Sequence, residues 1–166
     1  MMFFDIFANR LTIRGNLVAR TAMRIGTGRA TEPVGTDLPV LRDSQGRPFV
    51  PGSSFKGVLR SGVEQVARAA AGPRGACLPT SDEKDWCISS KRMAELKAHV
   101  KDDKGLAEDI WKEACLACRT FGSPWLASHV KVKDLGVDEV TWFEQFQVRD
   151  GVAIDRDKGT VAGKKL

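Results

Sequence analysis

A glycine- and proline-rich segment at residues 25–54 limits the folds open to this chain more than any other feature. It holds five glycines and four prolines, and proline lacks the backbone N–H that helices and inner strands need. A loop this long inside a compact domain is usually functional or disordered. Its second half contains short extended runs at residues 39–42 and 48–50, which can pair across a turn. The sequence therefore predicts a loop that is partly a hairpin, with Asp43 as an Asx-type turn residue.

The segments on either side of this loop have patterns of regular structure. Residues 11–24 alternate and are rich in β-branched side chains, which predicts a first strand with a bulge or bend at Gly15. Residues 55–71 place apolar side chains at helical spacing, after serines that can cap a helix and before Gly72 and Pro73, which stop it. The other expected elements are helices at residues 90–101 and 105–117, a strand at 129–135 and an extended β-hairpin at 141–154.

The start of the expected helix has an anion-binding pattern in the run PGSSFKGVLRS, residues 51–61. Gly52 lets the backbone approach a ligand closely, and the serines leave hydroxyl and amide groups at a helix N-terminus. Lys56 and Arg60 lie one turn apart on the same helix face. An ordinary capped helix with two solvated cations would show the same pattern. The candidate anion-binding residues of this run are Gly52, Ser53, Ser54, Lys56 and Arg60.

All four cysteines fall in a charged, irregular stretch at residues 72–124, which we interpret as an insertion. They form a CxxC pair and a more widely spaced pair: Cys115 with Cys118, and Cys77 with Cys87. In a reducing compartment such cysteines favour metal binding or buried thiols over disulfides. We predict a structural zinc ion held by four thiolates, which leave no open coordination position for catalysis. The alternatives are buried free thiols, or His99 in place of one cysteine.

The charge balance is consistent with a nucleic-acid partner. Lys and Arg total 26 against 21 acidic residues, a net charge of +5, and a modest positive excess favours phosphate-bearing partners without requiring them. The N-terminal apolar residues are interrupted by Asp5, Asn9 and Arg10, unlike a secretory signal. An apolar run long enough for a membrane span is also absent from the sequence. We therefore expect a cytoplasmic protein without a membrane partner.

Several ordered motifs resemble the RAMP superfamily, and most closely the backbone subunit of type III CRISPR effector complexes, which stacks along the guide RNA as a filament. The motifs are IGTG at residues 25–28, GTDLPVLRD at 35–43, GRPFVPGSSFKGVLRS at 46–61, RTFGSPW at 119–125 and VRDGVAIDRDKGTV at 148–161. The last of these is similar to the thumb hairpin of the family.

The resemblance implies an α+β, ferredoxin-like (RNA-recognition-motif-like) domain over residues 1–166. The cysteine-bearing insertion at residues 72–124 would interrupt this domain, and residues 139–165 would form its β-hairpin thumb. Family members normally continue past the thumb with another helix and strand, so we expect the domain to be incomplete at its C-terminus.

The resemblance also implies the chemistry. Asp37 matches the aspartate that the family uses for metal-dependent cleavage of target RNA by a 2′-hydroxyl, with Mg²⁺ or Mn²⁺ as the cation; a loop aspartate can also simply cap a turn. The resemblance makes RNA the ligand of the anion-binding residues named above, and it adds Gly26 and Gly28 of the IGTG motif to the RNA-binding residues. Val152 and Ile154 of the thumb would contact unstacked bases, or serve only as hairpin residues.

The implied partners are the CRISPR guide RNA, the target RNA and other RAMP subunits of the effector complex. Two other functions remain open from the sequence. One is a non-cleaving structural subunit of the same filament. The other is a guide-RNA-processing nuclease, which usually relies on a catalytic histidine, whereas this chain has two histidines and neither lies in its glycine-rich loops.

Overall fold

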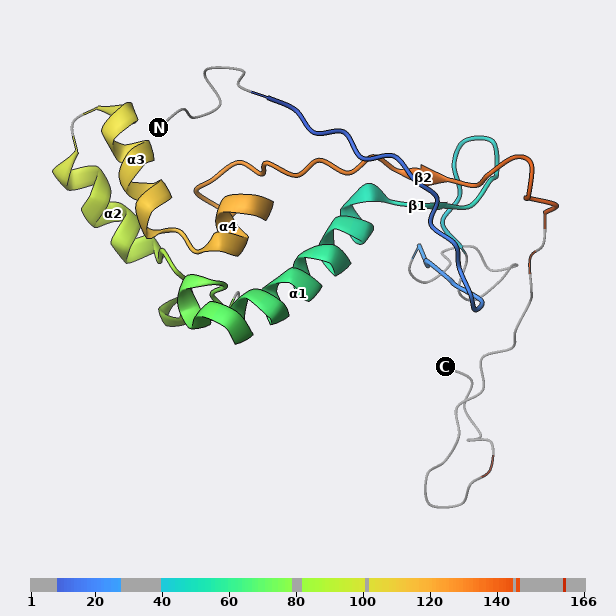
Figure 1. Ribbon diagram of the computed structural model, residues 1–166, viewed down its shortest axis with the longest axis horizontal. Helices are drawn as coiled ribbons and strands as arrows, with labels where there is room; N and C mark the ends of the chain where they lie inside the picture. Colours follow the sequence, from blue (N-terminus) through green and yellow to red (C-terminus); the bar gives the residue numbers. More distant parts are fainter. Residues whose placement is uncertain are drawn as a thin grey trace, which may run out of the picture. The chain divides into compact units, whose positions relative to one another are not determined.

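A computed structural model describes residues 9–27, 40–78, 82–100, 102–144, 146 and 160 of the chain. The chain divides into two compact units, Met1–Gly136 and Val137–Leu166, and the first contains the helices and strands (Figure 1). None of the described helices combines the length and the apolar character that crossing a membrane requires.

The longest helix, α1 (Gly52–Ala71), confirms the helix expected at residues 55–71. It begins earlier than expected because Pro51 occupies the N-cap position. Ser53 and Ser54 therefore lie exposed in the first turn, and the expectation that one of them caps the helix is wrong. The helix ends as predicted at Gly72, whose φ of 56° is left-handed and whose N–H donates to the carbonyl of Arg68.

The sheet in the described residues is small. Strand β1 (Phe49–Val50) directly precedes α1 and pairs antiparallel with β2 (Leu135–Gly136). Phe49 lies opposite Gly136, and Val50 lies opposite Leu135. The pairing brings the end of the glycine- and proline-rich segment beside a segment that follows the cysteines, near the start of α1 (Figure 1).

The turn before β1 forms as predicted. Arg42 and Pro48 make an antiparallel bridge, and the Asp43 N–H donates to the carbonyl of Arg47 at 2.8 Å. One carboxylate oxygen of Asp43 accepts the N–H groups of Gln45 and Arg47, each at 2.9 Å, which makes it an Asx-type turn residue. These bonds to the charged form, that of Arg47 above all, lower the pKa of Asp43.

Two expected strands do not form among the described residues. Residues 11–24 pair with no other described segment, and the side chains of Leu11 and Ile13 are each 85% exposed. Of residues 129–135, only Leu135 belongs to a strand. An alternating, β-branched run becomes a strand only when a second strand pairs with its backbone, and the described structure offers such a partner only near Gly26, which bridges to Val40.

The cysteine-bearing region is helical. It contains α2 (Ser90–His99), α3 (Asp103–Glu113) and α4 (Leu116–Phe121), of which α2 and α3 pack on each other (Figure 1). The helix expected at residues 105–117 is therefore two helices. The break occurs because the backbone is extended at Ala114 and Cys115, and Cys115 starts the next helix as its N-cap.

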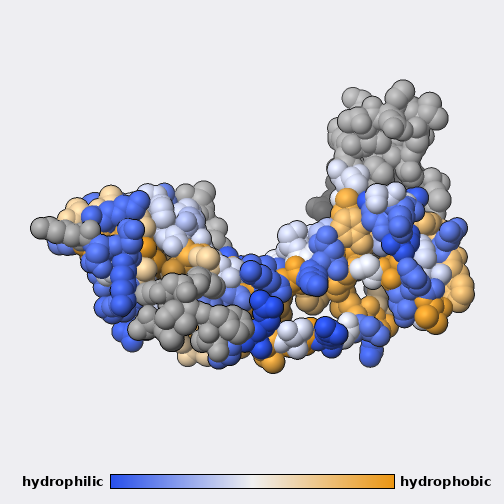
Figure 2. Space-filling view, turned by 90° about the horizontal axis from the view of Figure 1, so that it is seen from above, coloured by the Kyte–Doolittle hydropathy of each residue, from blue (hydrophilic) through white to orange (hydrophobic). Residues whose placement is uncertain are grey.

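The buried core also lies in this region and not along α1. Its members are Ala76, Cys77, Ile88, Met93, Leu96, Ile110, Ala114, Cys115, Ala117 and Cys118. From α1, Ala67 packs against them, whereas Val58 is 74% exposed and Val66 is 71% exposed. An apolar groove thus runs along α1, and Figure 2 shows apolar surface in orange directly beside hydrophilic surface in blue. The apolar spacing predicted the helix correctly, but most of that stripe is not covered by described residues.

Candidate metal centre

The structure brings together the four cysteines that the sequence singled out. Their Sγ atoms all lie within 4.8 Å of one another. Cys77, Cys115 and Cys118 are buried, Cys87 is half-buried, and all four are free thiols. His99 is not part of this group: it is exposed, and its Nδ1 lies 2.9 Å from the carbonyl oxygen of Glu95. The alternative with His99 as a ligand is therefore wrong.

Short turns and one helix start position these thiols. Cys115 is the N-cap of α4, and its sulfur accepts the N–H groups of Cys118 and Cys77, each at 3.4 Å. Cys77 follows the 3-10 turn Gly72–Arg74, and Cys87 follows a second one at Glu83–Asp85. A CxxC at a helix start places both sulfurs on the same side of the first turn, so that the two other loops need only supply one sulfur each.

Backbone hydrogen bonds hold the three ligand-bearing segments against one another. The Leu78 N–H donates to the carbonyl of Asp85 at 3.1 Å, which joins the loops of Cys77 and Cys87. The Ala117 N–H donates to the carbonyl of Gly75 at 3.0 Å, which joins α4 to the loop before Cys77. The segments that carry the sulfurs are thus also joined by backbone contacts that do not involve the thiols themselves.

The donor set fits a metal ion bound by four thiolates. Zinc–sulfur bonds of about 2.3 Å in a tetrahedron place the sulfurs about 3.8 Å apart. The Sγ atoms of Cys77 and Cys118 are separated by 3.7 Å, and all separations stay within 4.8 Å. Backbone N–H groups that donate to a ligand sulfur, as at Cys115, are typical of the contacts that orient metal ligands.

The thiols also perturb one another's protonation. Hydrogen bonds from Cys118 and Cys87, together with the backbone N–H groups, lower the pKa of Cys115. The contact with Cys115 raises the pKa of Cys87 to about 11, and it also raises the pKa of Cys118. One thiolate is therefore favoured, and a metal ion must displace the protons of the other thiols. Metal binding should accordingly weaken as the pH falls.

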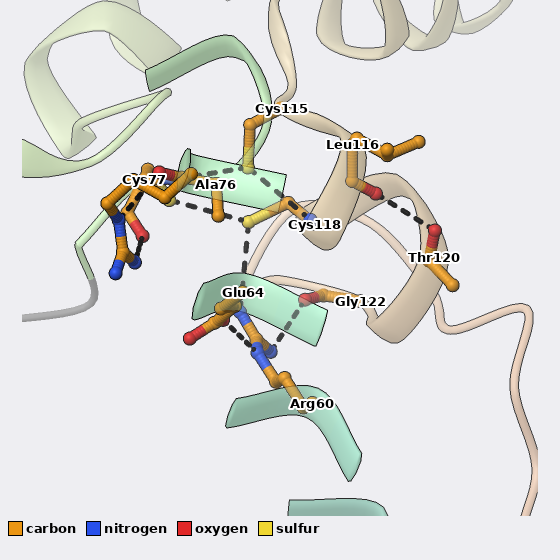
Figure 3. Close-up of polar contacts among 10 residues, drawn as sticks. Arg60, Glu64, Ala76, Cys77, Cys115, Leu116, Cys118, Thr120 and Gly122 are labelled. Carbon is orange, nitrogen blue, oxygen red and sulfur yellow. Dashed lines mark hydrogen bonds and ion pairs between the residues drawn. The ribbon is translucent and has the colours of Figure 1, made fainter. Parts of the chain in front are cut away.

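An arginine of α1 reaches this cluster. Nη2 of Arg60 lies 3.8 Å from the Sγ atom of Cys118, and Nη1 donates to the carbonyl oxygen of Gly122 at 3.0 Å (Figure 3). Nε of Arg60 donates to the carboxylate of Glu64 at 2.7 Å, and Glu64 is only 9% exposed. Glu64 was not among the residues singled out from the sequence, although its position one turn after Arg60 has the spacing of a helical ion pair.

Two other candidate residues of α1, Lys56 and Gly52, contact the chain that follows α4. Lys56 Nζ donates to Ser128 Oγ at 2.7 Å, and the Gly52 N–H donates to a carboxylate oxygen of Asp134 at 2.8 Å. A Cβ atom at Gly52 would lie only 2.8 Å from the carbonyl group of Lys133. Gly52 therefore permits a close approach of the chain's own backbone, where the sequence had suggested the approach of a ligand.

The remaining candidate residues are spread over the chain. Gly26 forms the bridge to Val40 described above. Four others lie outside the described residues: Gly28, Asp37, Val152 and Ile154. The expected thumb at residues 139–165 also falls mostly outside them.

Comparison with known proteins agrees with the motifs. The family model of the RAMP superfamily matches residues 16–166. The CRISPR system Cms endoribonuclease Csm3 of Methanothermobacter thermautotrophicus is 40% identical over 60 residues, which are 35% of this chain and 24% of that protein. The protein of the same name from Methanocaldococcus jannaschii is 40% identical over 57 residues, which are 34% of this chain and 23% of that protein. The matched stretch thus spans about a quarter of the length of these curated relatives.

Proposed function

Because this chain belongs to the RAMP superfamily, we propose that it is a guide-RNA-binding backbone subunit of a type III CRISPR interference complex. The observation that carries the proposal is the family match over residues 16–166, together with the likeness to two proteins named CRISPR endoribonucleases. In this proposal β1 and β2 belong to a ferredoxin-like sheet. Residues 72–124 are an insertion, residues 139–165 are the thumb, and other RAMP subunits are the neighbours.

The start of α1 is the proposed contact with the guide-RNA backbone. Ser53 and Ser54 are exposed in the first turn of α1, where backbone N–H groups and the helix dipole favour an anion. Lys56 lies in the next turn and is half-buried, held by Ser128. A phosphate at the helix start would therefore meet two hydroxyl groups and a cation whose position is already restricted.

Cleavage of the paired target RNA is assigned to Asp37 on its motif alone. Its carboxylate would hold Mg²⁺ or Mn²⁺, which stabilises negative charge on phosphate oxygens as a Lewis acid. The target's own 2′-hydroxyl would attack the adjacent phosphorus, and the bond from phosphorus to the 5′-oxygen of the next nucleotide would break. The products would be a 2′,3′-cyclic phosphate and a free 5′-hydroxyl. The two relatives are named endoribonucleases, which supports RNA cleavage as the activity.

The cysteine centre is proposed to hold a structural zinc ion. The short sulfur–sulfur separations and the N–H groups donated to Cys115 support this identity, and thiolates are soft ligands that suit zinc. With all four positions taken by Cys77, Cys87, Cys115 and Cys118, the ion would stabilise the region without taking part in cleavage.

Purification from cells followed by sequencing of the bound RNA tests the proposed function. We expect bound RNAs that carry a repeat-derived 5′ tag followed by varied guide sequence. Random cellular RNA, or none, would contradict guide binding. If tagged RNA is present but the assembled complex does not cut a complementary target in Mg²⁺ or Mn²⁺, the chain is a non-cleaving subunit of the same filament.

A further inference from the structure

We propose that Arg60 is a positioning residue of the cysteine centre, and that it couples metal loading to helix α1 through a hydrogen bond to the sulfur of Cys118. The inference rests on the proposed metal site. It gives Arg60 a role different from the direct phosphate contact that the sequence suggested.

The guanidinium group of Arg60 is fixed by three contacts. Its three nitrogen atoms each have a different partner: Nε has Glu64 at 2.7 Å, Nη1 has the Gly122 carbonyl at 3.0 Å, and Nη2 has the Cys118 sulfur at 3.8 Å. The Arg60 side chain is 28% exposed, and that of Glu64 is 12% exposed. A planar donor group held at three points is directed at its targets in one orientation.

The positive charge of Arg60 suits a cluster of thiolates. Four thiolates around a divalent cation carry an excess of negative charge, and hydrogen bonds from a cation to an ionised acceptor are stronger than those between neutral groups. Cys118 is a buried ligand of the proposed centre. A guanidinium beside its sulfur therefore stabilises the loaded, ionised state of the cluster more than the empty, protonated one.

Two of the acceptors of Arg60 lie at opposite ends of α4. Cys118 lies in the first turn of α4, and Gly122 is its C-cap residue. Arg60 thus holds both ends of this short helix against α1. Because Lys56 lies one turn before Arg60 on α1, loading the metal should also restrict the part of α1 that carries the proposed RNA contacts.

The same helix supplies a matched control. Arg68 donates from Nε to the carbonyl of Ala76 at 3.2 Å and from Nη2 to the carbonyl of Cys77 at 2.9 Å. It therefore also joins α1 to a ligand-bearing segment, but through backbone oxygens and not through a ligand sulfur. If Arg60 were only a structural tether, removing Arg60 or Arg68 would have the same effect on the metal centre. The proposal predicts different effects.

The test is titration of the full, metal-free chain with cobalt(II) alone, which reports sulfur–metal bonding through the sulfur-to-cobalt charge-transfer band in the near ultraviolet. The variants are Glu64→Gln, Arg60→Met in the Glu64→Gln background, and Arg68→Met. The shared background ensures that loss of Arg60 does not leave a buried, unpaired carboxylate. Circular dichroism of the same samples checks that each variant is folded.

Removing Arg60 should move the band to longer wavelength relative to Glu64→Gln, because a hydrogen bond lowers the energy of the sulfur lone pairs. The affinity for cobalt(II) should fall about 10- to 100-fold, as is usual when a partner of a metal ligand is lost. Arg68→Met should leave the band in place. If Arg60→Met does not fold, Arg60→Lys should show the same shift, smaller in size, since one ammonium cannot reach three acceptors.

Two results would overturn the inference and can be told apart. If the unaltered chain binds cobalt(II) without a charge-transfer band from sulfur, the proposed metal centre is wrong and the role of Arg60 is wrong with it. If the unaltered chain shows the band, but loss of Arg60 changes neither band nor affinity, the metal centre stands and only the coupling through Arg60 is wrong.

Discussion

Replacing Gly52 by Ala should destabilise the protein, although alanine is ordinarily the better helix former. A Cβ at residue 52 would lie 2.8 Å from both the carbonyl carbon and the carbonyl oxygen of Lys133, and it would also clash with the carbonyl oxygen of Val132. These are backbone atoms, so rotating a side chain cannot relieve the overlap. Moving α1 away would also stretch the 2.8 Å hydrogen bond from the Gly52 N–H to Asp134.

The expected magnitude follows from these opposing effects. Overpacking costs about 1–3 kcal/mol, and loss of a hydrogen bond to a charged group costs about 1.5 kcal/mol or more. Alanine recovers about 0.5–1 kcal/mol through its helix propensity. Helix α1 can keep the hydrogen bond to Asp134 and accept the overlap, or it can relieve the overlap and lose the hydrogen bond. In either case the free energy of unfolding should fall by about 1–2 kcal/mol.

Urea denaturation of the full chain measures this change, and α1 supplies two controls. Gly57 and Gly62 lie on the same helix, and a Cβ at either position meets nothing within 4 Å. Gly57→Ala and Gly62→Ala should each stabilise the protein by about 0.5–1 kcal/mol. If Gly52→Ala behaves like these two, the packing argument is refuted. If Gly52→Ala is as stable as these two variants but no longer binds RNA, the close approach at Gly52 serves a ligand.

The remaining predictions concern the metal and the RNA. Elemental analysis should find about one zinc per chain, and much less in material never exposed to chelator would contradict the site. Chelation should lower the thermal midpoint, and Cys118→Ser should lower it similarly and remove the effect of chelator, since metal binding here is folding free energy. Lys56→Ala should weaken guide-RNA binding regardless of sequence and reduce the salt slope by about one. The control is Lys112→Ala on α3. If Lys56→Ala leaves the salt slope unchanged, Lys56 only holds the chain at Ser128 and does not contact RNA. Asp37→Ala should slow target cleavage by about a hundredfold or more with binding nearly intact. Normal cutting by that variant, with other nucleases excluded, would refute the catalytic assignment.

The features that the sequence predicted correctly depend on neighbouring residues. The stop of α1 at Gly72, the Asx turn at Asp43 and the helical pattern of residues 55–71 all follow from local backbone preferences. The meeting of the four cysteines was predictable for a different reason. A CxxC pair with two further cysteines in the same segment favours a shared metal site, because disulfides are disfavoured in a reducing compartment.

The features that the sequence did not predict depend on distant partners. Residues 11–24 have the composition of a strand, but a strand needs a pairing backbone that no local pattern specifies. One partner of Arg60 is a sulfur 58 positions away, whereas its spacing from Lys56 suggested anion binding. The break at Ala114 was missed because the apolar pattern continues across it, while the requirement to present Cys115 to a cluster overrides helix propensity.

Two segments far apart in the sequence, the first half of α1 and the chain after α4, lie side by side. Gly52, Lys56 and Arg60 follow one another at intervals of one helical turn. Their partners are Asp134, Ser128 and Gly122, in that order. The chain after α4 therefore runs back along α1 in the opposite direction, and each turn of the helix holds it by one hydrogen bond. The residues that gave PGSSFKGVLRS the pattern of an anion site thus also close the cysteine-bearing region at its C-terminal end. In the proposed coupling, metal loading would act on this row of contacts first at Gly122, through Arg60.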